Sequence, residues 1–161
     1  MADYFKKKDI AIIGLLVAIE QFIKIIVKTF FSENKIMFWD GVFGFKPYLN
    51  TTQLSFFNNE LGMNVGLSVL IFLNIILLLM IPLSIYLLFK KEKVHKAIYL
   101  VHDFVFAATI CSLIDKVFWG GSLDYIYLFN RWIVDLKDIY FVLALIGVFY
   151  CSIEIEIRKR K

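Results

Sequence analysis

Four long apolar runs dominate this chain of 161 residues and constrain its fold more than any other feature. They extend over about residues 10–31, 63–89, 97–114 and 139–155. A helix needs about 20 apolar residues to cross a hydrocarbon core of about 30 Å, and each run approaches that length. Hydrophobic residues make up 60% of the chain, whereas soluble domains average about 45–50%. We therefore expect an all-α membrane protein, with four transmembrane helices forming one domain over residues 1–161.

Clusters of basic residues flank these runs and predict their orientation. Eleven of the 18 Lys and Arg residues lie before the first run, between the second and third, or after the fourth: Lys6, Lys7, Lys8, Lys90, Lys91, Lys93, Lys96, Arg158, Lys159, Arg160 and Lys161. By the positive-inside rule, both termini are expected in the cytoplasm and the loops 32–62 and 115–138 outside. The net charge of +4 is explained by this placement, so no nucleic-acid partner is expected.

The first outer loop, residues 32–62, is rich in aromatic and β-forming residues. This composition predicts a few short strands lying on the outer membrane surface. Aromatic side chains suit the headgroup zone, and four candidates occur here: Trp39, Phe43, Phe45 and Tyr48.

The two cysteines, Cys111 and Cys151, lie in apolar runs. Counted along the helices, they lie roughly 15 Å or more apart. Since a disulfide needs Cα atoms within about 7 Å, we expect two free thiols that pack as small apolar groups. No residues have the spacing of metal ligands, so neither a metal nor a cofactor is expected.

Two charged residues interrupt the first run. Glu20 and Lys24 are four residues apart, which places them on one helix face in the favourable orientation. They either neutralise each other so that the helix can insert, or they serve function, as ionisable residues within membranes commonly do. These charges, the length of the run and the lack of a small-residue cleavage site argue against a cleaved signal peptide.

His102 and Asp103 lie inside the third run, about 10 Å from its cytoplasmic end. A transporter could use such a pair as a proton relay. A hydrogen-bonded contact between helices is the favoured interpretation.

Four aspartates gather at the outer ends of the third and fourth runs: Asp115, Asp124, Asp135 and Asp138. Asp138 is placed to cap the fourth helix, where the helix dipole favours a carboxylate. Asp124 has no such structural explanation. Two carboxylates at a membrane surface can share one proton, so that one activates water and the other donates a proton.

Five stretches of the sequence resemble, in order, motifs of lipoprotein signal peptidase, the type II signal peptidase of bacteria. Residues 20–24 (EQFIK) resemble the family's DQxxK, and residues 111–116 (CSLIDK) resemble its GNxxDR. Residues 121–125 (GSLDY) resemble its G-x-VVDF, and residues 134–138 (VDLKD) resemble its FNxAD. Residues 50–55 (NTTQLS) resemble its N-x-G-A-A-F at the first positions.

The resemblance implies roles for individual residues. Asp124 and Asp138 match the catalytic aspartate dyad of the family. Asp135 stands where the motif has Asn, so the substitution Asp135→Asn is expected to be tolerated. The other matched positions would bind substrate or support the dyad: Glu20, Lys24, Asn50, Ser112, Asp115, Lys116 and Asp135.

The family also implies an activity. Its members are aspartic endopeptidases of the bacterial cytoplasmic membrane, with the active site at the outer face, and they cleave prolipoproteins before the lipid-modified cysteine. The expected partners are such a substrate and membrane lipids, and the protein is expected to act as a monomer. The alternative is a non-catalytic relative that binds lipid or lipopeptide, or a small subunit for transport or assembly. A transporter would carry its ionisable residues near mid-membrane, whereas most lie toward the outer face here.

Overall fold

The computed structural model describes residues 7–51, 62, 65–91 and 97–159. Four long helices account for most of them: α1 (Lys7–Phe30), α2 (Leu67–Lys91), α3 (Ala97–Ile114) and α4 (Leu136–Lys159). Each contains a stretch long and apolar enough to cross a membrane. The chain is therefore a multi-pass membrane protein. Three predicted features fall outside the described residues. They are the Met63 start of the second helix, part of the first outer loop, and five of the flanking basic residues, Lys6, Lys93, Lys96, Arg160 and Lys161.

Apolar side chains cover the outward faces of the helices. Phe22, Leu79 and Phe149, on three different helices, are 65%, 69% and 70% exposed. Exposed apolar surface of this extent is unfavourable in water and favourable against lipid chains, since the helices satisfy their own backbone hydrogen bonds.

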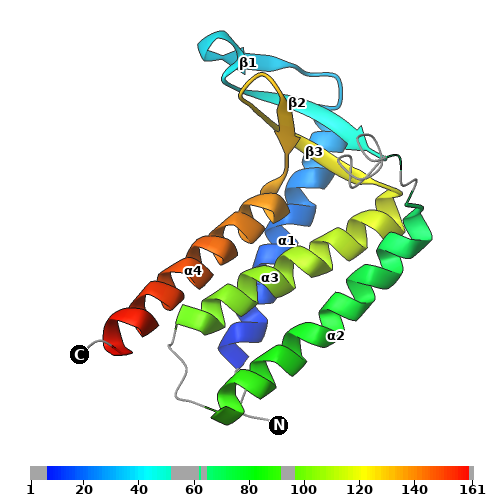
Figure 1. The fold of residues 1–161 in the computed structure, drawn as a ribbon. Helices are drawn as coiled ribbons and strands as arrows, with labels where there is room; N and C mark the ends of the chain where they lie inside the picture. The colour runs from blue at the N-terminus through cyan, green and yellow to red at the C-terminus, as the bar shows by residue number, and fades with distance from the viewer. Residues whose placement is uncertain (1–6, 52–61, 63–64, 92–96, 160–161) are drawn as a thin grey trace.

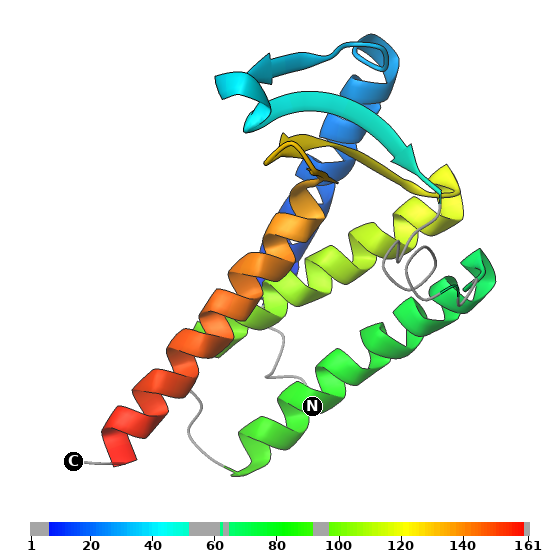
Figure 2. The same ribbon diagram turned by 45° about the horizontal axis from the view of Figure 1, so that its top comes forward.

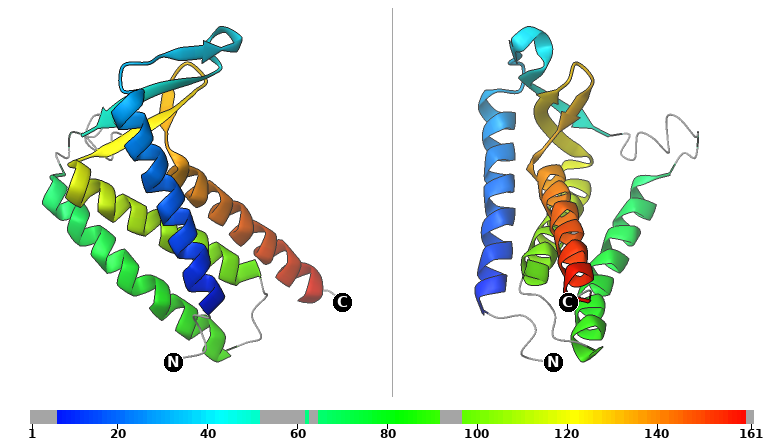
Figure 3. Two further views of the ribbon diagram at one scale, coloured as in Figure 1. Left: turned by 180° about the vertical axis from the view of Figure 1, so that it is seen from behind. Right: turned by 60° about the vertical axis from the view of Figure 1, so that its left-hand side comes forward.

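Helix α3 lies at the centre of the bundle and contacts each of the other three helices (Figures 1 and 3). Its Ala107, Ala108 and Cys111 have no exposed surface. Small residues allow helices in a membrane to approach closely, which explains why they occupy the centre. Cys111 and Cys151 are both buried, free thiols, as the sequence predicted.

A four-stranded antiparallel sheet crosses one end of the bundle (Figure 2). Its strands are β1 (Ile36–Phe38), β2 (Phe43–Asn50), β3 (Ser122–Leu128) and β4 (Trp132–Val134), in that order. The predicted strands of the first loop are present, but the second loop supplies the other half of the sheet. A two-stranded ribbon is marginally stable by itself, so β2 gains its support from β3. We call this end of the bundle the sheet end.

Aromatic residues of the sheet are partly exposed. Trp39 is 80% exposed, and Phe43 and Tyr48 are 44% and 48% exposed, whereas Phe45 is half-buried. Their placement among lipid headgroups remains a prediction.

A π-helical turn, η3 (Asp115–Trp119), follows α3 and leads into the sheet. It ends at Gly120, which has a left-handed φ of 64°. At the next residue, Gly121, a Cβ atom would lie 2.7 Å from the carbonyl oxygen of Asn50. These two glycines let the chain reverse direction and bring the start of β3 against the end of β2. Such π turns are frequent at functional sites.

Candidate active site

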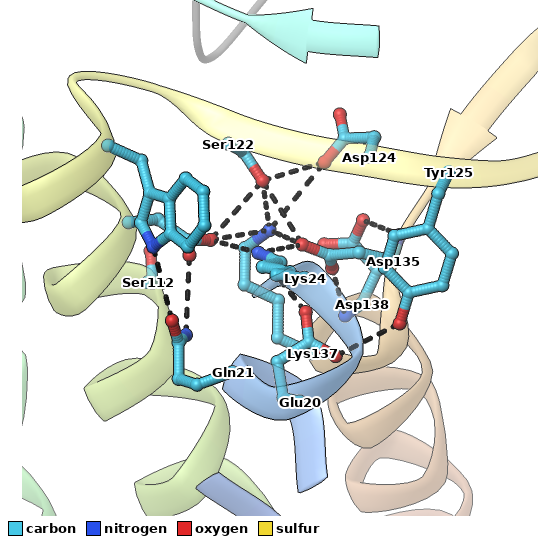
Figure 4. A network of polar contacts seen from close by, with 12 residues as sticks. Glu20, Gln21, Lys24, Ser112, Ser122, Asp124, Tyr125, Asp135, Lys137 and Asp138 are labelled. Carbon is cyan, nitrogen blue, oxygen red and sulfur yellow. Dashed lines mark hydrogen bonds and ion pairs between the residues drawn. The ribbon is translucent and has the colours of Figure 1, made fainter. Parts of the chain in front are cut away.

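Polar and charged side chains form a buried cluster where the sheet meets α1, η3 and the start of α4 (Figure 4). We call it the polar cluster, and it consists of Glu20, Lys24, Asp115, Ser122, Asp124, Asp135, Lys137 and Asp138. Four of these side chains have no exposed surface: Glu20, Lys24, Asp115 and Asp135. Burial of ionised groups is costly unless they are paired, so the contacts among them determine whether the cluster is stable.

Lys24 connects α1 to the other elements of the polar cluster. Its Nζ lies 2.6 Å from Asp115 Oδ2 and 2.7 Å from Asp135 Oδ2. It also lies 3.1 Å from Glu20 Oε1, the predicted partner one helical turn away. The contacts with Asp115 and Asp135 show that Lys24 does more than neutralise Glu20, because these aspartates belong to other elements.

The neighbours of Lys24 on α1 are also fixed by hydrogen bonds. The Tyr125 hydroxyl donates to Glu20 Oε2 over 3.2 Å. Gln21 Nε2 donates to Asp115 Oδ1 over 3.5 Å, and Gln21 Oε1 accepts from Trp119 Nε1 over 3.2 Å. Burial and the charge of Glu20 raise the pKa of Tyr125 well above its ordinary value, so its hydroxyl remains a donor.

Lys137, in the first turn of α4, is the second cation of the cluster and retains 7% exposure. Its Nζ forms an ion pair with Asp135 and lies 3.3 Å from Asp115 Oδ2 and 3.8 Å from Asp124 Oδ1. It also donates a hydrogen bond to Ser122 Oγ over 2.5 Å. Lys137 thus contacts three carboxylates: Asp115 of η3, Asp124 of β3 and Asp135 at the residue before α4.

Ser122 and Asn50 hold Asp124 from two sides. Ser122 Oγ lies 2.6 Å from Asp124 Oδ1, closer than it lies to Asp135 (3.1 Å) or Asp115 (3.3 Å). A hydroxyl has one proton to donate, and the shortest contact identifies Asp124 as its acceptor. Asn50 Nδ2 donates to Asp124 Oδ2 over 3.4 Å. Both oxygens of Asp124 are therefore oriented.

Asp135 and Asp138 form a reciprocal cap at the start of α4. Asp135 Oδ1 accepts from the Asp138 backbone N–H over 3.2 Å, and Asp138 Oδ2 accepts from the Asp135 backbone N–H over 3.3 Å. The helix begins at Leu136, three residues before the predicted Ile139. The capping residue is Asp135, so the prediction that Asp138 caps the helix end is corrected: Asp138 is the third helical residue and its side chain closes the capping box.

Asp124 and Asp135 differ in their pKa. Burial raises the pKa of Asp124 to about 6, although Lys137 and the hydrogen bond from Ser122 oppose the rise. Burial also acts to raise the pKa of Asp135, but Lys137 and Lys24 outweigh it and hold that pKa below its ordinary value. Asp135 is therefore the permanent anion, whereas Asp124 can exchange a proton near neutral pH.

Three carboxylates of the cluster lie close enough to share a ligand. Asp124, Asp135 and Asp138 offer oxygen atoms within 4.8 Å of one another. Such a group could hold a cation, but the Lys137 ammonium already contacts two of its members. Carboxylates this close together can also transfer protons to and from a water molecule.

Most of the predicted site residues meet in the polar cluster or contact it. Glu20, Lys24, Asp115, Asp124, Asp135 and Asp138 belong to it, and Asn50 contacts it through Asp124. Ser112 and Lys116 contact each other instead, because Lys116 Nζ donates to Ser112 Oγ over 2.6 Å and to its carbonyl oxygen over 3.2 Å.

Two members of the cluster, Ser122 and Lys137, were not predicted. Ser122 lies two residues before Asp124 on a strand, which places both on one face of the sheet, and that spacing was the available signal. Lys137 lies between two aspartates in the sequence but had no expected partner. His102 and Asp103 lie outside the cluster, and the Nδ1 atom of His102 lies 2.6 Å from the Ile98 carbonyl oxygen of its own helix.

Comparison with known proteins identifies the fold and the family. Two solved structures, both described as bacterial membrane enzymes determined by the in meso method, share the fold. The first has a TM-score of 0.70 and 17% identity, with 94% of this chain and 90% of that chain covered. The second has a TM-score of 0.74 and 18% identity, with 92% and 94% covered. No curated protein sequence matches this chain.

The family result comes from sequence. The family model described as signal peptidase (SPase) II matches residues 12–154, which include the whole polar cluster. The chain therefore belongs to the signal peptidase II family of membrane hydrolases that process lipoproteins.

Proposed function

We propose that this protein is an aspartic endopeptidase that cleaves prolipoproteins before the lipid-modified cysteine, with Asp124 and Asp138 as its catalytic dyad. The observation that supports this assignment is the approach of the two carboxylates at the sheet end, with oxygen atoms within 4.8 Å. Asp124 is 4% exposed, whereas Asp138 is only partly buried and so gives water and substrate a side from which to approach the pair. The match to the signal peptidase II family supports the same reaction.

In the proposed mechanism, Asp124 is the base and Asp138 the acid. Asp124 accepts a proton from a water molecule whose oxygen adds to the scissile carbonyl carbon, while Asp138 donates a proton to the carbonyl oxygen. The tetrahedral intermediate then collapses and the C–N bond breaks. Asp124 passes its proton to the leaving nitrogen, and Asp138 recovers a proton from a hydroxyl of the intermediate.

The proposed orientation places the sheet end outside the cytoplasmic membrane of a bacterium. The basic residues at the start of α1 and the end of α4 lie at the opposite end of the bundle and would face the cytoplasm (Figure 1). The substrate would reach the dyad by diffusion within the bilayer, with its lipid chains remaining in the membrane and its peptide beside the sheet. A single chain carries both aspartates, so a monomer suffices.

The decisive experiment compares two substrates. The purified protein is incubated with a prolipoprotein carrying a diacylglyceryl cysteine, and with the same prolipoprotein lacking the lipid. Cleavage of the lipidated form before the cysteine, and not of the other, supports the proposal. A folded protein that binds the lipidated form but leaves it uncut would instead favour the non-catalytic lipopeptide-binding relative.

Cleavage is expected to weaken as the pH falls below about 6. Asp124 must be ionised to accept a proton, and burial raises its pKa to about 6, so each further pH unit removes about nine-tenths of the active form. The measurement is kcat/KM against pH, with tryptophan fluorescence reporting that the protein stays folded. A rate that does not change between about pH 5 and pH 7 would exclude Asp124 as the base.

Asp135→Asn is expected to remain folded and active, whereas Asp135→Ala should lose about 0.5–2 kcal/mol of stability. Asn retains an oxygen that accepts the hydrogen bond from the Asp138 N–H, so the cap is preserved. Lys24 and Lys137 each still contact two other carboxylates. Thermal unfolding and cleavage assays of both variants test this. An Asp135→Asn protein that folds but has no activity would place the second catalytic aspartate at 135 instead of 138.

A further inference from the structure

We propose that Lys137 is a positioning residue that keeps Asp124, the base of the dyad, ionised. This inference rests on the proposed function, because it concerns the same dyad. It adds a residue that acts through Asp124 and Ser122 without touching the substrate.

The location of Lys137 is unfavourable for a charged side chain unless other groups stabilise the charge. It lies in the first turn of α4, where the helix dipole disfavours a cation. It is also 7% exposed, so its ammonium has lost nearly all of its water. Both effects act against a lysine here, and the contacts with Asp115, Asp124 and Asp135 offset them.

Lys137 acts on Asp124 both directly and through Ser122. Its Nζ lies 3.8 Å from Asp124 Oδ1. It also donates to Ser122 Oγ, which in turn donates to the same Oδ1 atom of Asp124. A cation and a polarised hydroxyl therefore both favour the ionised form of Asp124.

Other charged groups around Asp124 do not take the place of Lys137. They are Glu20 and Lys24 on α1, Asp115 and Lys116 on η3, and Asp135 and Asp138 at the start of α4, with Tyr48 paired opposite Asp124 on β2. Lys24 contacts Glu20, Asp115 and Asp135, and Lys116 contacts Ser112. Among the described lysines and arginines, Lys137 is the one that forms an ion pair with Asp124.

Lys137 is matched by an anion within the cluster. Asp135 and Lys137 form an ion pair with each other. Together they add no net charge to the cluster, yet they place an ammonium beside Asp124.

The short contact between Lys137 and Ser122 also resembles a serine–lysine pair, in which lysine would remove the proton from a serine nucleophile. Here the ammonium contacts three carboxylates, each of which favours the protonated amine. A protonated amine cannot act as a base, so the geometry favours the positioning role. The experiment below separates the two.

The first test is the pH dependence of cleavage in Lys137→Met, which keeps the length of the side chain and removes its charge. The acidic limb of kcat/KM is expected to move upward by about 1–3 pH units, because a carboxylate that loses a neighbouring cation protonates more readily. Lys137→Arg, which keeps the charge, should move the limb less. An acidic limb in Lys137→Met that coincides with that of the wild type would overturn the proposal.

The second test does not depend on cleavage. Protonation of the Asp124 carboxyl is followed in the wild type and in Lys137→Met by infrared spectroscopy, with Asp124→Asn identifying the band. The titration midpoint should rise by the same 1–3 pH units, whereas Lys46→Met on β2 should leave it in place. If the wild type cleaves no substrate but this midpoint moves, the proposed function fails while the role of Lys137 stands. If the midpoint does not move, the role of Lys137 is excluded.

Two further variants cover misfolding of Lys137→Met and the serine–lysine alternative. If Lys137→Met does not fold, Asp135→Asn/Lys137→Met removes the charge pair together and is compared with Asp135→Asn, because Asp135 itself raises the pKa of Asp124. The Asp124 midpoint of the double variant should lie above that of Asp135→Asn, and equal midpoints would overturn the proposal. Ser122→Ala should retain measurable cleavage with a smaller upward shift of the acidic limb. Complete loss of cleavage in a folded Ser122→Ala, with activity retained in Asp124→Asn, would replace the proposal by a serine–lysine mechanism.

Discussion

Asp124→Asn is expected to lower kcat by a factor of about 10² to 10⁴, the usual contribution of a general base, while the protein remains folded. Asn has the same shape, and its oxygen can still accept the hydrogen bond from Ser122. It cannot accept a proton from water at neutral pH, so the chemical step is lost. Because burial raises the pKa of Asp124, its ionised form is not a favoured structural anion, and its removal should not reduce stability.

Asp138→Asn should reduce kcat to a similar extent for the complementary reason. The amide still accepts the backbone N–H of Asp135 and so preserves the capping box, but it has no carboxylic acid proton to donate. Both variants are assayed with the lipidated substrate, with thermal unfolding in detergent as the folding control. Glu33→Gln, an exposed carboxylate after α1, serves as the matched control with unchanged kcat. Activity within tenfold of the wild type in either dyad variant would remove the dyad as assigned.

Lys24→Met is expected to destabilise the protein by about 3–5 kcal/mol, the usual cost of removing one partner from a buried ionic network. Without Lys24, Asp135 keeps the cation of Lys137, but Glu20 loses its ion pair and Asp115 loses its closest cation. Like charges without a cation between them repel strongly where water is excluded. The loss also weakens the connection of α1 to η3 and to the start of α4, because Lys24 forms ion pairs with Asp115 and Asp135.

The measurement is thermal unfolding in detergent of Lys24→Met and of Lys28→Met. Lys28 lies one turn further along α1, is exposed, and lies over the Trp119 ring at 4.7 Å. Its removal should cost about 0.5–1 kcal/mol. Adding Asp115→Asn to Lys24→Met should recover part of the lost stability, since it removes one of the uncompensated charges. Equal unfolding temperatures for the two lysine variants would show that Lys24 does not hold the cluster together.

The four helices could be predicted because lipid imposes a simple length and composition on any segment that crosses it. The start of α4 was misplaced by three residues because residues 136–138 include two charged side chains, which hydropathy assigns to a loop. In the structure these charges point into the polar cluster and the helix includes them. A tertiary contact here outweighs the local composition.

The polar cluster was predictable where a residue has a local partner and not elsewhere. Glu20 and Lys24 are neighbours on one helix, and their pairing follows from spacing alone. The contacts of Lys24 with Asp115 and Asp135 depend on how α1, η3 and α4 pack, which spacing does not determine. Strand β3 was missed for a similar reason: its pairing with β2 requires the close approach of Gly121 to Asn50.

The contact between Lys24 and Asp115 joins residues 91 positions apart in the chain, and this separation has a consequence for biosynthesis. The ribosome completes α1 long before it reaches η3 or α4, so the helix enters the bilayer while Asp115 and Asp135 do not yet exist. During that interval, the carboxylate one turn from Lys24 is Glu20. Glu20 can therefore act as the counter-ion of Lys24 while α1 lies in lipid, before Asp115 and Asp135 are translated.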